Sequence, residues 1–141
     1  MFPLLDRRLG ELGHGDVVVI ADGKFSATAD AKRPPIWVPG HSTLEVVEAL
    51  LTEVEHDPLD GPPAFMIMEN PDDEPASEWA PRAAEFRALV NAAGPWRDRA
   101  QAQIMQAVMR SDFHLLSKEA ELVIATTDPT SYACFALRVA G

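Results

Sequence analysis

Cysteine is nearly absent from this sequence: Cys134 is the single one among 141 residues. One thiol cannot form a disulfide within the chain, so a reducing, cytoplasmic location is the simplest interpretation. No apolar run approaches the roughly 20 residues of a membrane-spanning helix. The opening MFPLLDRRLG also lacks the basic and long apolar regions of a secretory signal. We therefore expect one cytoplasmic domain over residues 1–141 that does not enter a membrane.

Positive charge is scarce as well. The 12 Lys and Arg residues face 22 Asp and Glu residues, for a net charge of −10, which argues against a nucleic-acid partner. No glycine pattern matches a nucleotide-binding fingerprint, and the four histidines lack the helical spacing of zinc ligands. No G-x-S-x-G elbow indicates a serine nucleophile. Proton transfer by histidine and aspartate, with no cofactor and no metal ion, suits the polar residues that are present.

Hydrophobic patterning predicts strands and helices that alternate along the chain. The predicted strands are 16–21, 36–38, 64–68, 102–109, 121–127 and 132–139, and the predicted helices are 3–12, 41–54, 78–94 and 112–120. The composition of 102–109 also permits a helix. This alternation is typical of an α/β domain whose mainly parallel sheet is covered by helices. The last two strands, joined by the turn sequence DPTS, are expected to run antiparallel and to make the sheet mixed.

Two helix starts have capping signals. Ser42 and Glu45 match the capping box, in which each side chain binds a backbone N–H of the first turn, and an apolar stripe follows them. Ser111 is the predicted cap of the helix at 112–120.

The stretch ELGHGDVVVIADGKF places His14 before a buried strand and Asp22 at its end. On one straight strand the two would lie roughly 25 Å apart, too far to share a small substrate. Three alternatives are open: separate sites, a turn that folds His14 back, or a site that combines His14 of one subunit with Asp22 of another. Taken alone, His14 could also cap the preceding helix, and Asp22 could form a turn with Gly23.

Several segments together carry a family resemblance. They are the leading helix, GHGDVVVIAD, GHSTLEVVEALL and the closing SYACFALRVAG. Their order and spacing resemble the D-ribose pyranase / L-fucose mutarotase (RbsD/FucU) family over nearly the whole chain, from about residue 3 to 141. Arg110 precedes Tyr132 by 22 residues, which agrees with the spacing of that family's sugar-contacting basic residue and tyrosine. The arginine resembles the fucose branch, because the ribose branch tends to carry histidine there.

The resemblance implies an RbsD-like, three-layer α/β/α fold and a carbohydrate isomerase that needs no cofactor. It implies that His14 is the proton donor. The sugar contacts that it implies are Asp22, Arg110, Tyr132, Ala133 and Cys134. Members of the family assemble into toroidal decamers with sites at subunit boundaries, so this chain is expected to form a homodecamer or another ring. Such a site would resolve the distance between His14 and Asp22.

One position departs from the family pattern. The family's tyrosine motif usually ends in asparagine, as Y-x-N, whereas this chain has Cys134. A thiol hydrogen-bonds more weakly than an amide, and one lost contact of this kind costs about 0.5–1.5 kcal/mol. This is enough to change which sugar is preferred.

Ring opening of a sugar hemiacetal needs one proton delivered to the ring oxygen and one removed from the anomeric hydroxyl. An imidazole with a pKa near 6.5 can do both. Together with this chemistry, the resemblance implies a mutarotase or pyranase that acts on a monosaccharide such as L-fucose. Arg110 and Tyr132 would hold hydroxyls, although outside the family context Arg110 could simply pair with a surface carboxylate and Tyr132 could anchor a core edge. The alternatives are a non-catalytic sugar-binding or regulatory module, suggested by Cys134, and an interaction subunit whose role is ring assembly.

Overall fold

The computed structural model describes residues 7, 12, 16–23, 34–53, 64–67, 82–92, 106–130 and 133–138. The strands are β1 (Val17–Ala21), β2 (Ile36–Val38), β3 (Ala64–Ile67), β4 (Gln106–Met109), β5 (Leu122–Thr126) and β6 (Phe135–Arg138). The helices are α3 (Thr43–Glu53), α5 (Ala83–Ala92) and α7 (Arg110–Glu119). Every helix in these ranges is too short or too polar to cross a bilayer. Of the predicted helix at 3–12, Arg7 is helical and Leu12 is not; its other residues lie outside the described ones.

The described strands form one mixed sheet in the order β2-β5-β1-β6-β3-β4. β6 runs antiparallel to both of its neighbours, β1 and β3, while the β1–β5, β2–β5 and β3–β4 pairs are parallel. The mixed, mainly parallel sheet is therefore confirmed. The stretch that also permitted a helix is a strand over residues 106–109, whereas 102–105 lie outside the described residues.

The last two strands run in opposite directions, as predicted, but they do not pair with each other. β1 lies between them: Val19 is opposite Val123 of β5 on one side and opposite Ala136 of β6 on the other. All five residues of β1 are buried. A buried strand needs partners for its backbone N–H and C=O groups on both edges, and β5 and β6 supply one edge each.

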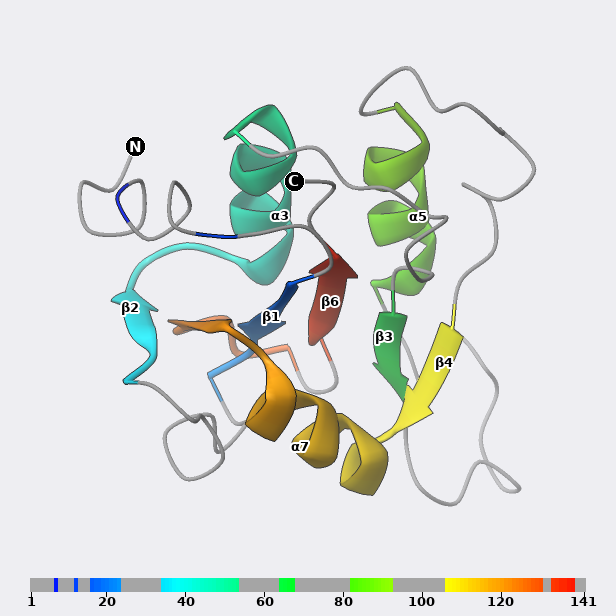
Figure 1. Cartoon of the computed structure of the whole chain (residues 1–141). Coiled ribbons are helices and arrows are strands. Elements are labelled where there is room, and N and C mark those ends of the chain that lie inside the picture. The colour runs from blue at the N-terminus through cyan, green and yellow to red at the C-terminus, as the bar shows by residue number, and fades with distance from the viewer. Residues whose placement is uncertain are drawn as a thin grey trace.

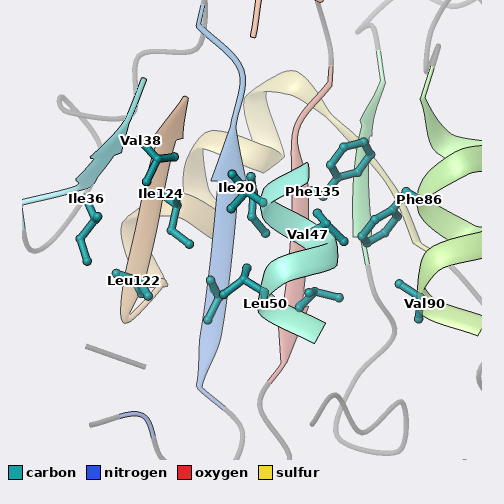
Figure 2. Close-up of a cluster of buried hydrophobic side chains, with 13 residues drawn as sticks. Ile20, Ile36, Val38, Val47, Leu50, Phe86, Val90, Leu122, Ile124 and Phe135 are labelled. Atoms are coloured by element: carbon teal, nitrogen blue, oxygen red, sulfur yellow. The ribbon is translucent and has the colours of Figure 1, made fainter. Parts of the chain in front are cut away.

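Helices cover both faces of the sheet, which gives the three layers that were expected (Figure 1). Alternate residues of β1 point to opposite faces, so that Val18 and Ile20 pack with α3 and α5, while Val17, Val19 and Ala21 pack with α7. Figure 2 shows the first of these two cores, in which side chains of the sheet meet those of α3 and α5.

An aromatic pair joins α5 to the middle of the sheet. The rings of Phe86 and Phe135 are stacked, with centroids 4.4 Å apart and an interplanar angle of 17° (Figure 2). Both side chains are buried, and a pair of this kind adds about 0.5–1.5 kcal/mol beyond the area it buries. This contact holds α5 against β6, the strand that brings Cys134 to the sheet edge described below.

The capping box of α3 is confirmed. Ser42 Oγ accepts a hydrogen bond from the Glu45 N–H, and Glu45 Oε1 accepts one from the Ser42 N–H, each at 3.1 Å. The predicted cap of α7 is wrong, because that helix begins at Arg110 and places Ser111 inside its first turn. The reason is that α7 follows β4 without a connecting residue, so no position remains at 111 for a cap.

Candidate functional site

One edge of the sheet gathers the ends of strands that are far apart in the sequence. β1 and β5 are parallel and end there at Ala21 and Thr126, and the antiparallel β6 begins there at Phe135. We call this the carboxyl edge. In α/β sheets, ligands bind outside the carboxyl ends of parallel strands. Asp22 follows β1 and Cys134 precedes β6, so both residues lie at this edge.

Asp22 and Cys134 contact each other twice. The Cys134 thiol donates to Asp22 Oδ2 at 3.3 Å, and the Asp22 backbone N–H donates to Cys134 Sγ, also at 3.3 Å. The exposed fraction is 3% for Asp22 and 0% for Cys134. Burial, together with the negative charge of Asp22, raises the pKa of the Cys134 thiol well above its ordinary value. Cys134 therefore stays protonated at neutral pH and remains a hydrogen-bond donor to the carboxylate.

A second buried carboxylate, Asp128, lies beside this pair and is 6% exposed. Its Oδ2 accepts hydrogen bonds from the Thr43 backbone N–H at 2.9 Å and from the Thr43 hydroxyl at 3.2 Å, and its Oδ1 accepts one from the Thr130 N–H at 2.9 Å. Burial opposes ionisation of Asp128, but these hydrogen bonds from Thr130 and Thr43 outweigh it and lower its pKa below the ordinary value. Asp128 is thus an ionised group that ties the start of α3 to the loop after β5.

Backbone contacts join the loop after β1 to the loop after β5. The Gly23 N–H donates to the Asp128 carbonyl at 2.7 Å. The Thr126 hydroxyl donates to the Ala21 carbonyl at 2.8 Å and accepts a hydrogen bond from the Asp128 N–H at 3.2 Å. Asp22 therefore lies between two residues, Ala21 and Gly23, whose backbone groups are both bound to the segment 126–128.

The structure brings together part of the site that the sequence predicts. Asp22, Ala133 and Cys134 are buried at the carboxyl edge. Arg110 is the first residue of α7 and directly follows β4, whose carboxyl end lies at the same edge, but its side chain is outside the described part of the chain. His14 and Tyr132 also lie outside the described residues.

Sequence reasoning did not single out Asp128. The residue types of its segment, DPTS, predict only a turn between two strands. A signal was present, because Asp128 follows a buried strand by two residues, much as Asp22 directly follows β1. Acidic residues just beyond the carboxyl ends of two parallel strands meet at the same sheet edge.

The chemistry available at this edge is that of hydrogen bonding to hydroxyl groups. A carboxylate such as that of Asp22 accepts hydrogen bonds from hydroxyl groups. Among the described residues, no group of three or more His, Cys, Asp and Glu side chains is arranged to hold a metal ion.

Comparison with known proteins matches the chain to one family over nearly its full length. The sequence model of the RbsD / FucU transport protein family matches residues 2–140. The human protein named fucose mutarotase is 28% identical over 138 residues, which covers 96% of this chain and 86% of the human protein.

Solved structures agree with this match. The FucU structure from Bifidobacterium longum is 30% identical and superposes with a TM-score of 0.78, covering 100% of this chain and 96% of the other. The fucose mutarotase of Streptococcus pneumoniae, solved in complex with L-fucose, is 26% identical and has a TM-score of 0.78, covering 99% of this chain and 93% of the other.

Proposed function

The chain belongs to the RbsD/FucU family, and we propose that it is a monosaccharide mutarotase, an isomerase that interconverts the anomers or ring forms of a sugar such as L-fucose. A relative named fucose mutarotase aligns with 96% of the chain, and a structure of the same fold was solved with L-fucose bound. The structural observation that carries the proposal is the carboxylate of Asp22, buried at the carboxyl edge and hydrogen-bonded to Cys134.

Our proposed mechanism is acid–base ring opening. The protonated imidazole of His14 delivers a proton to the ring oxygen while a water molecule accepts the proton of the anomeric hydroxyl, so that the C1–O5 bond breaks and leaves a free aldehyde and a hydroxyl group at C5. Rotation about the C1–C2 bond and reclosure on the other face of the carbonyl then invert the anomer, with the protons returned. A group with a pKa near neutrality is suited to both transfers. The reaction consumes no reductant and no second substrate.

The other site residues would fix the pose of the sugar. Asp22 would accept a hydrogen bond from a sugar hydroxyl or orient the imidazole of His14. Arg110 and Tyr132 would form hydrogen bonds with further sugar hydroxyls. Ala133 would add a further contact to the sugar, and Cys134 would act on the sugar through Asp22, with which its thiol forms a hydrogen bond. Holding reactants in one geometry can supply several kcal/mol of a barrier, so these contacts would set both the rate and the choice of sugar.

The proposal includes a ring-shaped homo-oligomer, such as a homodecamer, located in the cytoplasm. Support for the shared site comes from the sequence order, in which His14 precedes β1 and Asp22 follows it; a site shared between neighbouring subunits would bring the two residues together. The only ligand required is the monosaccharide. A strongly acidic chain, with a net charge of −10, gives no attraction for nucleic acid or for anionic membrane surfaces.

Saturation-transfer NMR on a panel of sugars tests the proposed function. The wild-type protein is added to L-fucose, D-ribose, D-galactose and D-glucose at equilibrium, and exchange between anomer signals is measured. We expect accelerated exchange for L-fucose or a close relative. Binding without accelerated exchange would contradict the proposal and would indicate a non-catalytic sugar-binding module.

A further inference from the structure

We infer that Asp128 is a positioning residue of the sugar site: its carboxylate and its carbonyl together hold the loops after β1 and β5 in register, so that Asp22 and Cys134 face each other at the carboxyl edge. This inference rests on the proposed function for its consequence in catalysis. Its structural part, the placement of Asp22, can be tested separately.

The carboxylate of Asp128 fixes its own loop from two directions. Oδ2 binds the backbone N–H and the hydroxyl of Thr43, in the first turn of α3, while Oδ1 binds the N–H of Thr130. The carbonyl of Thr130 in turn accepts the N–H of Ala133 at 3.4 Å. One side chain is therefore connected to the start of a helix and, through Thr130, to the residue that precedes Cys134.

The carbonyl of Asp128 fixes the neighbouring loop. It accepts a hydrogen bond at 2.7 Å from the N–H of Gly23, the residue directly after Asp22. The approach is close enough that a Cβ at position 23 would lie 3.1 Å from that carbonyl oxygen and 3.2 Å from the carbonyl carbon of Thr127. Glycine is the residue that allows two backbones to come this near. A shift of Asp128 would therefore move the backbone on one side of Asp22.

The charge of Asp128 also reaches the Asp22–Cys134 pair. Beyond the main effect of burial, the negative charges of Asp22 and Asp128 both favour the protonated thiol of Cys134 and raise its pKa. Asp128 thus supports the thiol as a donor to Asp22 in addition to fixing the loops. No contact of Asp128 with a sugar is needed for either effect.

The test compares Asp128→Asn with a remote control of the fold, Val90→Ala. Asn keeps the size of Asp128 but has one acceptor oxygen in place of two. Its side chain therefore cannot accept hydrogen bonds from both Thr43 and Thr130. Val90 is fully buried in the core between α5 and the sheet, on the face away from Cys134. Both variants are expected to unfold more easily, and only the first is expected to alter the site.

Two readouts separate positioning from simple loss of stability. The first readout is the rate of anomer exchange as a function of L-fucose concentration. We expect Asp128→Asn to raise KM by up to about tenfold, which corresponds to the loss of about one net hydrogen bond to the sugar. Val90→Ala is expected to keep the wild-type KM. In amide NMR spectra, Asp128→Asn is expected to shift the Gly23 and Cys134 signals and to speed hydrogen exchange at Gly23, whereas Val90→Ala leaves the shifts unchanged.

Unchanged amide signals of Gly23 and Cys134 in Asp128→Asn would overturn the inference, whatever the KM for L-fucose. An equal rise of KM in both variants would overturn it as well. If wild-type protein accelerates anomer exchange of no sugar, the proposed function fails. The amide signals still test whether Asp128 positions Asp22. Should Asp128→Asn fail to fold, Thr43→Val removes only the hydroxyl bond to Oδ2, and we expect it to shift the same signals by a smaller amount.

Discussion

The thiol of Cys134 donates a hydrogen bond to the carboxylate of Asp22 over 3.3 Å, although 112 residues separate them in the chain. The contact exists because β1 and β6 are antiparallel neighbours, so the end of one meets the beginning of the other. The RbsD/FucU family usually has asparagine where this chain has Cys134. Here the thiol serves as a buried donor to the aspartate that we propose binds the sugar.

Removal of this donor tests its role. We predict that Cys134→Ala weakens sugar binding by roughly twofold to tenfold, because a net hydrogen bond contributes about 0.5–1.5 kcal/mol. Cys134→Asn restores the family residue and a strong amide donor, so it is expected to retain activity and to change the ranking of sugars. The measurement is the KM of each variant for the NMR sugar panel. An Ala variant with wild-type KM and sugar preference would show that the thiol does not support Asp22.

The reactivity of Cys134 provides an independent check of its environment. Only the thiolate attacks disulfide reagents, and burial raises the pKa of this thiol well above its ordinary value. We predict that Ellman's reagent at pH 8 leaves the native protein unlabelled for as long as it stays folded. In urea, one thiol per chain should react at the rate of a free cysteine. Rapid labelling of native protein would contradict the burial of Cys134 against Asp22.

Acid titration of stability tests the network around Asp128. Its hydrogen bonds lower its pKa in the folded state from the ordinary value of 3.8. This contribution to stability is therefore complete above that value and is lost as the pH falls through the lower, folded-state pKa. We predict that wild-type protein is more stable than Asp128→Asn at pH 7, and that the difference between their free energies of unfolding in urea shrinks as the pH falls below 3.8. A difference that stays constant as the pH falls below this value would contradict the network.

These outcomes show which parts of the molecule the sequence could predict. β1 and α3 were predicted because their signals are local: a continuous apolar run, and a capping box whose two residues are three positions apart. The placement of β1 between β5 and β6 was not predicted, because a short turn between two strands does not reveal a third strand that separates them. The start of α7 was missed for a different reason, since Ser111 has a capping residue type but β4 leads directly into the helix.

The site residues also divide into those that the sequence predicts and those that it does not. Asp22 was identified from its position after a buried strand and from the resemblance, and the structure places it at the carboxyl edge beside Cys134. Asp128 was missed because its partner Thr43 lies 85 residues away, and no local pattern connects the two. The roles of His14, Arg110 and Tyr132 stay predictions, as their side chains lie outside the described residues.

A shared site makes a prediction about mixed oligomers. If His14 of one subunit works with Asp22 of its neighbour, co-expressed His14→Ala and Asp22→Ala chains should form some wild-type pairs. In a ring with one kind of heterologous interface, random assembly at equal amounts gives such a pair at about one site in four. We predict exchange activity near that fraction of wild type from two inactive parents. No recovered activity in verified mixed rings would place both residues in the same subunit.

The central claim is that the imidazole of His14 moves protons during sugar ring opening. Its most direct test is saturation-transfer NMR of L-fucose with wild-type protein and with His14→Ala at equal concentration, once circular dichroism shows that both are folded. We predict that wild-type protein accelerates exchange between the anomers, while the variant returns it to near the uncatalysed rate and still binds the sugar. Exchange in His14→Ala as fast as in wild-type protein would contradict the account.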